Sequence, residues 1–457
     1  MEISIKQLIS LIAKLAKRAH DSGLIVPRVE TFFNWELQDF NYTEKGIENT
    51  SALGKETFKK DWFLPTRELS KEIYTSSEFS NTEKQIKINY KSANPTYDLE
   101  RFCDSILPIY LDNPRKENRK EVEKVIGRFL RDLRQEPVTI GGAFDVYGLV
   151  LESKKIKIDK NTFIRQVEKK DLEVPLRILP GLNLGHSNPH VSYHSILEIK
   201  LLADRNHMNN AVIETTADKY IALLRLFKVG SVHYLSYQMI SDVLLPPFFG
   251  GRMTSGNTNT RKEFYLIKKE ENLLRKFLTK LPIPEYVYSK FQQEKKFDHL
   301  SIAFDRYSEA LTESTFHERR ITNIVIGLEA LFSTDSIELK FKLSTRISKI
   351  LSFFNNDPLV VKNIISLAYD VRSKFSHGEH LDEKLKVKIE KECHSIDEFS
   401  MLLTNYLRIC LITMLLTART KKDFISLVDE ALIDDTKNKE LKRLLKKTEV
   451  VRGALLI

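Results

Sequence analysis

The chain has little cysteine, and the cysteine it has is not arranged for a metal site. Its three cysteines are Cys103, Cys393 and Cys410; none belongs to a C-x-x-C pair, and their number is odd. This pattern argues against a disulfide framework and against a zinc module built on cysteine. It is typical of a reducing compartment, so we expect a cytoplasmic protein.

Several common catalytic motifs are also missing. Gly141-Gly142 and Gly250-Gly251 lack the following Lys-Ser/Thr of a phosphate-binding P-loop. The chain has neither a G-x-S-x-G elbow nor an H-E-x-x-H sequence. The sequence therefore gives no sign of nucleotide hydrolysis, and we expect no cofactor.

Long uninterrupted hydrophobic runs are scarce. The first 23 residues have apolar residues at helical spacing broken by lysines, with no small-residue cleavage site, so we expect no signal peptide. The most apolar run, residues 401–418, contains Asn405, Tyr406 and Arg408. We interpret this run as a buried core helix and expect no membrane span.

The charge balance is basic. Lysine and arginine number 72 against 62 acidic residues, a net charge of +10, and both signs are mixed along the chain. An excess of positive charge favours an anionic partner such as RNA, although it is weak evidence by itself.

Three histidines recur at every fourth position, as metal ligands on one helix face would. They are His186, His190 and His194, but Pro189 interrupts any helix there and the residues that follow have a strand pattern. We therefore favour a loop or strand surface and expect no metal site.

The pattern of the chain predicts an α+β fold, with a mixed N-terminal α/β region followed by an all-α helical bundle. We expect a helical or irregular region over 1–135, a mixed strand and helix region over 136–285, a bundle over 286–435 and a basic tail over 436–457. The first two regions can also be one domain.

Helical periodicity marks residues 97–111, 116–135, 215–227, 297–313, 317–333, 338–355, 358–376, 395–419 and 421–433. Strand patterns cover 139–142, 144–152, 155–159, 191–202, 232–240 and 263–268.

The most informative motif lies at the end of the helix predicted over 358–376. Pro358 fits the first helical turn and Gly378 fits the C-terminal cap. Near this end, Arg372 precedes His377 by five positions. An Arg carries a permanent positive charge and a His exchanges protons near neutral pH, so the pair suits RNA cleavage without a metal. In an ideal helix the two lie about 140° apart, so either the helix unwinds at 375–377 or the two side chains act across a dimer interface.

Three runs in this half of the chain carry a resemblance: residues 324–333 around Glu329, 338–348 around Arg346, and 369–378 around Arg372 and His377. In this order and spacing they resemble the HEPN superfamily, specifically its ApeA-like branch, over about residues 300–420. The family signature is an Arg followed a few residues later by a His. Ser373 occupies the first position between them, where the family often has another polar residue and the ApeA-like branch commonly tolerates Ser.

The resemblance implies a HEPN-like helical bundle that forms a homodimer or higher homo-oligomer, with two motifs meeting in one composite active site. It assigns phosphate binding to Arg372, acid–base transfer to His377 and an orienting role to Glu329. The products would be a 2′,3′-cyclic phosphate and a 5′-hydroxyl. Other pairings stay open at this point: Glu329 could hold Arg346 or Arg372, Arg372 could pair with Asp370 or Glu379, and Arg346 could contact RNA or form a bundle salt bridge.

Further basic residues are candidates for RNA binding. Lys374 lies inside the motif, and Lys442 and Arg443 lie in the basic segment 437–447. That segment could contact phosphates or pack as a terminal amphipathic helix.

The family also implies a biological setting. It is that of a toxin-like antiviral defence effector in prokaryotes, which acts in abortive infection by cutting structured RNA, with tRNA the leading candidate. Such effectors occur alone or with a regulatory protein, including Toprim-type partners. The alternative is an inactive HEPN module that binds RNA, dimerises, or senses or scaffolds a partner.

Overall fold

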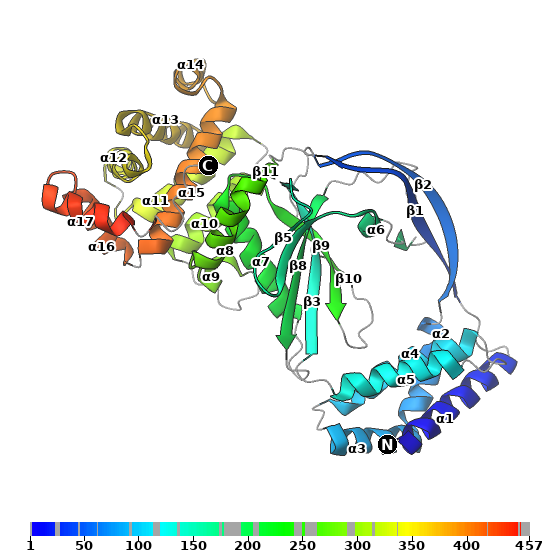
Figure 1. Cartoon of the computed structure of the whole chain (residues 1–457). Helices are drawn as coiled ribbons and strands as arrows, with labels where there is room; N and C mark the ends of the chain where they lie inside the picture. Colours follow the sequence, from blue (N-terminus) through cyan, green and yellow to red (C-terminus); the bar gives the residue numbers. More distant parts are fainter. Residues whose placement is uncertain are drawn as a thin grey trace.

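The chain forms an N-terminal helical cluster, a long hairpin, a central sheet and a C-terminal helical bundle (Figure 1). The computed structural model describes residues 2–22, 28–43, 46–61, 63–90, 94–112, 119–134, 138–172, 176–177, 193–203, 210–241, 249–251, 263–289, 298–312, 316–335, 337–417, 419–446 and 448. The described strands lie between Arg28 and Leu266, and the described elements after Leu266 are helical, so the predicted α+β class is confirmed.

The N-terminal cluster has a hydrophobic core of its own. Its helices are α1 (Glu2–Asp21), α2 (Phe63–Tyr74), α3 (Ser77–Tyr90), α4 (Pro95–Asp112) and α5 (Arg119–Arg134). Apolar residues at helical spacing on α1, among them Leu8 and Ile12, are buried against α4. Phe102 and Phe129 stack with ring centroids 4.4 Å apart, which joins α4 to α5.

A long antiparallel hairpin, β1 (Arg28–Thr43) with β2 (Gly46–Asp61), arches between this cluster and the central sheet (Figure 1). At its tip, the Leu151 amide donates a hydrogen bond of 3.2 Å to the Tyr42 hydroxyl. The hairpin corrects the expectation of a helical or irregular region over 1–135. In β1, apolar residues occur at positions separated by multiples of two, as in a strand: Val29, Phe33, Trp35 and Leu37. The partner strand β2 contains two glycines and three lysines and has no such pattern.

The central sheet is six-stranded, with the order β10-β9-β3-β8-β6-β5. β3 (Val138–Tyr147) pairs on one side with β8 (Tyr193–Ala203) and on the other with β9 (His233–Ser241), both antiparallel. Gly141 is required in β3, because a Cβ there would collide with the Ile199 carbonyl of the neighbouring strand. The other members are β5 (Lys155–Lys157), β6 (Thr162–Gln166) and β10 (Phe249–Gly251).

Helices and short elements between residues 149 and 288 accompany the central sheet. Helix α7 (Asn210–Phe227) packs on it, and α8 (Glu271–Lys280) and α9 (Glu285–Tyr288) pack on α7. Short elements are β4 (Leu149–Leu151), which pairs in parallel with β11 (Phe264–Leu266), together with α6 (Lys169–Leu172), β7 (Leu176–Arg177) and the 3₁₀ turn η3 (Lys268–Glu270).

The bundle consists of α10 (His299–Thr312), α11 (His317–Phe332), α12 (Leu339–Leu351), α13 (Pro358–Ser376), α14 (Glu383–Cys393), α15 (Ile396–Thr417), α16 (Lys421–Glu430) and α17 (Asp435–Leu445), with a 3₁₀ turn, η4 (Ser352–Phe354), after α12. The sequence did not predict α14, whose composition is mostly charged. Most of the described part of the basic tail is helix α17, which packs against α16.

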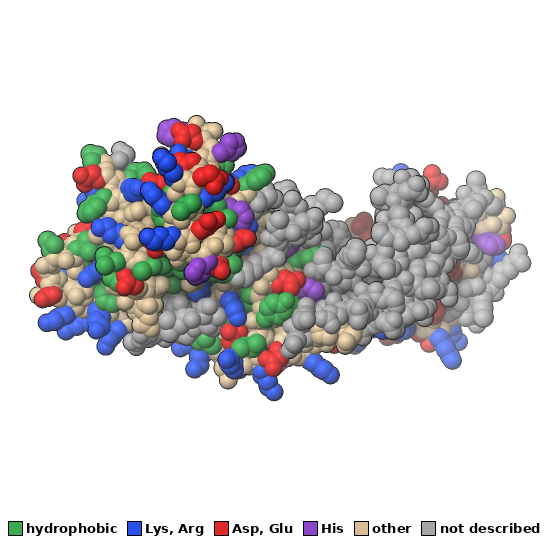
Figure 2. Space-filling model, turned by 90° about the horizontal axis from the view of Figure 1, so that it is seen from above, with side chains coloured by type: hydrophobic (Ala, Val, Ile, Leu, Met, Phe, Trp, Pro, Cys, Tyr) green, Lys and Arg blue, Asp and Glu red, His purple; other side chains and the backbone are tan. Residues whose placement is uncertain are grey.

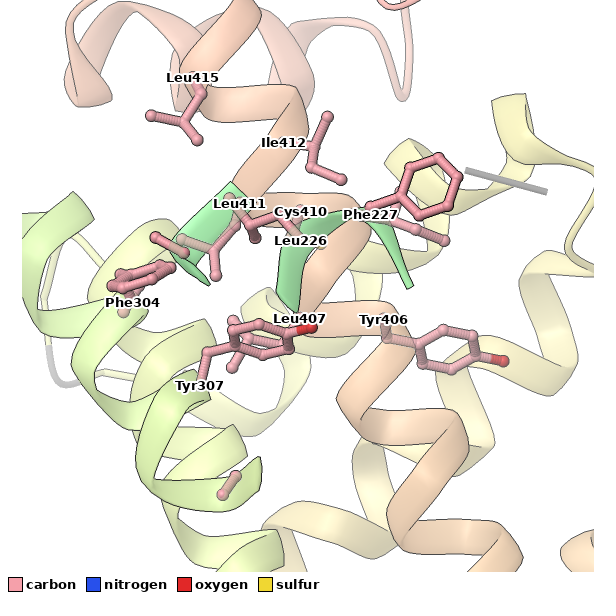
Figure 3. Packing of buried hydrophobic residues seen from close by; sticks show 14 of the residues in the cluster. Leu226, Phe227, Phe304, Tyr307, Tyr406, Leu407, Cys410, Leu411, Ile412 and Leu415 are labelled. Atoms are coloured by element: carbon pink, nitrogen blue, oxygen red, sulfur yellow. The ribbon is translucent and has the colours of Figure 1, made fainter. Parts of the chain in front are cut away.

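Helix α15 is long and apolar enough to cross a membrane, but 72% of its most apolar window is buried inside the protein. It runs through the bundle, with Tyr406, Leu407, Cys410 and Leu411 packed among residues of other helices (Figure 3). This burial confirms the interpretation of residues 401–418 as a core helix.

One core extends from the sheet into the bundle without interruption at residue 285. Arg408, in the middle of α15, has 0% of its surface exposed. Its Nη1 donates to the carbonyls of Leu226 and Phe227, at 3.0 and 2.7 Å, at the end of α7. The Tyr307 hydroxyl of α10 donates to the carbonyl of Arg225 at 2.6 Å. Bundle side chains therefore satisfy carbonyls that the end of α7 leaves without helical partners.

We predict that Arg408→Met destabilises the whole chain, because two buried carbonyls lose their donor. The free energy of unfolding should fall by about 3 kcal/mol, measured by urea denaturation. The control is Arg419→Met, because Arg419 pairs with Glu440 at the surface and its loss should cost less than about 1 kcal/mol. Equal effects of the two substitutions would contradict the role assigned to Arg408.

Candidate functional site

Helix α13 carries the Arg–His motif, and its ends are fixed by local sequence. The Asp357 carboxylate accepts hydrogen bonds from the amides of Leu359 and Val360, and Pro358 occupies the first turn. At the other end Gly378 has φ +75°. Its amide donates to the Phe375 carbonyl, and the next amide donates to the Lys374 carbonyl. This is the Schellman pattern, so the predicted glycine cap is confirmed.

The helix does not unwind ahead of the histidine. It stays α-helical through Ser376, and the His377 amide still donates to the carbonyls of Ser373 and Lys374. Of the two solutions offered by the sequence, local unwinding at 375–377 is therefore wrong. The arrangement across two chains remains a prediction.

Arg372 pairs with Glu329 of the neighbouring helix α11. Arg372 Nη2 lies 3.4 Å from Glu329 Oε2, with side-chain exposures of 31% and 16%. The Arg372 Nε and Glu329 Oε1 atoms are buried and lack hydrogen-bond partners among the described residues. Burial raises the pKa of Glu329, and the charge of Arg372 opposes that shift. The site thus has a positive group with unused hydrogen-bonding capacity.

The sequence reasoning missed Tyr369, whose ring centroid lies 5.8 Å from the guanidinium carbon of Arg372. The sequence could have indicated this contact, because Tyr369 and Arg372 are three residues apart and residues at that spacing are neighbours on a helix surface. The ring therefore lies beside the guanidinium.

His377 is exposed at the end of α13. In the described part of the chain its side chain makes no hydrogen bond or ion pair. Arg372 and His377 are therefore not joined by a direct contact within one chain, as expected from their angular separation on a helix.

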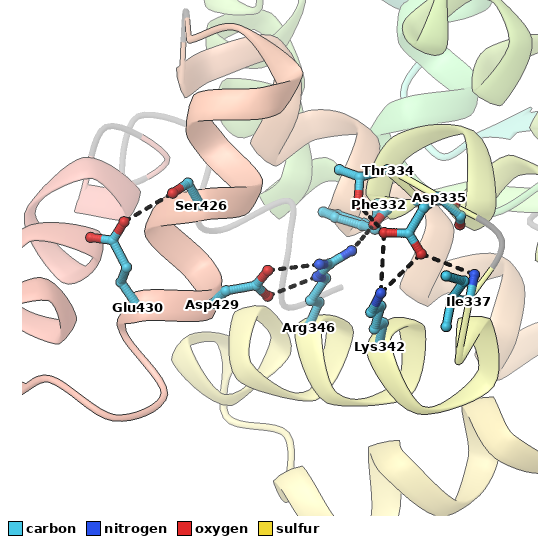
Figure 4. Close-up of polar contacts among 10 residues, drawn as sticks. Phe332, Thr334, Asp335, Ile337, Lys342, Arg346, Ser426, Asp429 and Glu430 are labelled. Atoms are coloured by element: carbon cyan, nitrogen blue, oxygen red, sulfur yellow. Dashed lines mark hydrogen bonds and ion pairs between the residues drawn. The ribbon is translucent and has the colours of Figure 1, made fainter.

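Arg346, the second predicted supporting arginine, is used inside the bundle (Figure 4). Its Nε and Nη2 donate to the two Asp429 carboxylate oxygens, at 2.7 and 2.6 Å, and its Nη1 donates to the Phe332 carbonyl at 2.5 Å. The residue is 5% exposed. This geometry supports the salt-bridge alternative, in which Arg346 joins α12 to α16, and leaves no free donor pair for RNA.

The other residues predicted around the motif have different partners. Asp370 binds Lys340 Nζ at 2.6 and 2.8 Å instead of Arg372. Lys374 pairs with Glu379 at 3.0 Å and with Asp382 at 3.1 Å. The hydrogen bond that Lys374 donates to Glu379 is the main cause of the raised pKa of Lys374. Lys374 is therefore occupied within the chain. Ser373 is half-buried, and its carbonyl accepts the His377 amide.

Lys442 and Arg443 lie on the exposed face of α17, whose other face buries Leu441, Leu444 and Leu445. The segment is thus an amphipathic helix that also presents cations. It packs against α16 and α15, so these two cations are not brought to the Arg372 site.

Of the three histidines spaced four residues apart, only His194 lies among the residues that the structure describes. His194 lies on β8, where its Nε2 is 2.9 Å from Glu263 Oε1, and His186 and His190 lie outside the described residues. Within the described ranges, no three His, Cys, Asp or Glu side chains gather as metal ligands would.

Comparisons of the chain with protein-family models, with curated proteins and with solved structures find no match.

We predict that the two arginines differ in their effect on stability. Arg346→Met should lower the free energy of unfolding by about 3 kcal/mol, because it leaves Asp429 and the buried Phe332 carbonyl without their donor. Arg372→Met should cost about 1 kcal/mol, because its ion pair is longer and partly exposed. Chemical denaturation of both variants measures the difference, and a larger loss from Arg372→Met would contradict it.

We also predict a pH effect from Glu329. A carboxyl group whose pKa is raised on folding stabilises the protein most below its unfolded pKa, and this contribution is lost as the pH rises through the folded value. The unfolding free energy of the wild type should therefore fall relative to that of Glu329→Gln as the pH rises from below 4.5, the ordinary value. Denaturation curves at a series of pH values test this, and a difference of the opposite sign would refute it.

Proposed function

We propose that the chain is a HEPN-type endoribonuclease that cleaves RNA without a metal. The observation that carries this proposal is Arg372, whose side chain is partly exposed and whose Nε has no hydrogen-bond partner among the described residues, on the same helix as the exposed His377. Fixed positive charge and an exchangeable proton are the two requirements of phosphodiester cleavage by the substrate's own hydroxyl.

In the proposed reaction the 2′-hydroxyl of the RNA attacks the adjacent phosphorus. A base removes the proton of that hydroxyl, and the bond from phosphorus to the 5′-oxygen breaks. The leaving oxygen takes up a proton and becomes a 5′-hydroxyl, while the other product carries a 2′,3′-cyclic phosphate. Arg372 stabilises the charge on the phosphate oxygens and His377 transfers protons. DNA lacks the nucleophile and would not be cut.

The separation of the two residues supports a site made by two chains. Arg372 and His377 lie about 140° apart around the helix axis, and α13 remains regular between them. A dimer that brings α13 helices together would place the Arg of one chain near the His of the other.

The setting that fits this activity is the bacterial or archaeal cytoplasm, where a toxin-like nuclease limits phage infection. Structured RNA such as tRNA is the proposed substrate, and the net charge of +10 suits an anionic partner. A regulatory protein, for example one of Toprim type, would restrain the activity.

A second candidate function is an inactive module that binds RNA or a protein partner. It is favoured by the Arg372–Glu329 pair, which engages part of the guanidinium within the chain. This candidate predicts RNA binding with no cleavage, whatever residues occupy positions 372 and 377.

The test is cleavage of total RNA by purified protein in the presence of a chelator. His377→Ala should lower the rate about 10²- to 10⁴-fold, the usual contribution of an acid–base group, without changing Tm. His380→Ala is the matched control, because His380 is also exposed and lies three residues further on, and it should retain activity. Full activity of His377→Ala would reject the proposed function.

A further inference from the structure

A groove between α12 and α13 lies beside the Arg372 site and shares Tyr369 with it. Its volume is about 760 Å³, within the range of small-ligand sites. Helix α12 lines it with Lys340, Phe341 and Ser344, and α13 lines it with Lys362, Ser366 and Tyr369.

The groove contains aromatic rings that can stack on a base. Phe341 is 59% exposed. Tyr369 is half-buried and lies next to both the groove and Arg372. An exposed ring next to polar groups is the platform on which single-stranded nucleic acids stack their bases.

A cation accompanies the exposed ring. Lys362 Nζ lies 5.4 Å from the Phe341 ring centroid, and Lys362 forms no ion pair with a described residue. Helix α12 has no acidic residue, but its Lys342 and Arg346 pair with Asp335 and Asp429. Lys340 is neutralised by Asp370, and Glu338 brings a negative charge to the rim, so Lys362 is the group best placed to bind a phosphate.

Helical spacing connects the groove to the motif. Lys362, Ser366 and Tyr369 follow one face of α13, and Arg372 comes three residues later. The rise from Lys362 to Arg372 is about 15 Å, which matches about four stacked nucleotides at about 3.4 Å each. Basic, acidic and hydrophobic side chains are interspersed on the face of the molecule seen in Figure 2.

We propose that this groove binds unpaired nucleotides of the RNA next to the cleaved bond, with a base stacked on Phe341 and a phosphate at Lys362. The inference rests on the proposed cleavage at Arg372 and His377 and adds the form of the substrate to it. An unpaired stretch such as a loop fits, because its bases are free to stack, whereas the bases of a duplex are not.

Binding is measured in the His377→Ala background, so that the RNA stays intact, by fluorescence anisotropy with a labelled oligoadenylate. Phe341→Ala and Lys362→Ala should each weaken binding about tenfold. The matched control is Tyr97→Ala in the N-terminal cluster, because Tyr97 is 47% exposed and also has a cation near its ring, Arg101 at 4.9 Å. It should bind like the parent.

A probe with abasic positions separates stacking from charge. The His377→Ala protein should bind the abasic probe more weakly than it binds oligoadenylate. Adding Phe341→Ala should not weaken binding of the abasic probe further, whereas adding Lys362→Ala should. Unchanged oligoadenylate binding by Phe341→Ala and Lys362→Ala would overturn the groove proposal, even if the wild type cleaves RNA.

Light scattering of the same variants tests another occupant, a second copy of the chain. If Phe341→Ala lowers the molar mass along with RNA binding, the groove is an interface between copies and the proposal is wrong. If the mass is unchanged and binding falls, the groove proposal holds. A wild type that fails to cleave RNA would instead refute the proposed function of the motif.

Discussion

The rest of the structure depends on the contact between a buried cation in α15 and the end of α7. Arg408 lies in the most apolar helix of the bundle and is 0% exposed. A guanidinium in such a place is costly unless its donors are used, and here it donates to the Leu226 and Phe227 carbonyls and to Asn405 Oδ1. The contact explains why the bundle and the sheet share one core instead of forming two independent domains.

The position of α15 in turn sets the position of the candidate site. Helix α11 packs closely on α15 at Gly327, where a Cβ would lie 2.8 Å from Leu407 Cδ2. Glu329 follows Gly327 on the same helix and reaches Arg372 of α13. The orientation of Arg372 therefore derives from packing that begins at α7. Glu329 is half-buried, and its Oε1 has no hydrogen-bond partner among the described residues. Such an arrangement is unfavourable for stability and is common where a site needs a positioned charge.

Much of this bundle could be predicted from the sequence, because local rules determine it. Asp357, Pro358 and Gly378 define both ends of α13 through capping, which needs no tertiary information. The partner of Arg372 could not be predicted in the same way. Asp370, Glu379 and Glu329 were all plausible, and the choice depends on which helix lies alongside: Asp370 faces Lys340 of α12, and Glu379 binds Lys374. The hairpin β1–β2 was not predicted because one of its strands lacks alternation of apolar and polar residues. Helix α14 was not predicted because its three buried residues are separated by mostly charged ones.

The measurement that tests the central claim most directly is complementation between two inactive variants. Arg372→Ala and His377→Ala are each assayed for RNA cleavage alone and then after mixing under conditions that exchange subunits. If the Arg of one chain acts with the His of another, a wild-type dimer has two such Arg–His pairs and a mixed dimer keeps one of them. Half of the dimers are mixed when chains assort at random, so cleavage should return to about a quarter of the wild-type rate. No recovery would contradict the composite site, provided that light scattering shows dimers and that the two variants, carrying different affinity tags, co-purify after mixing.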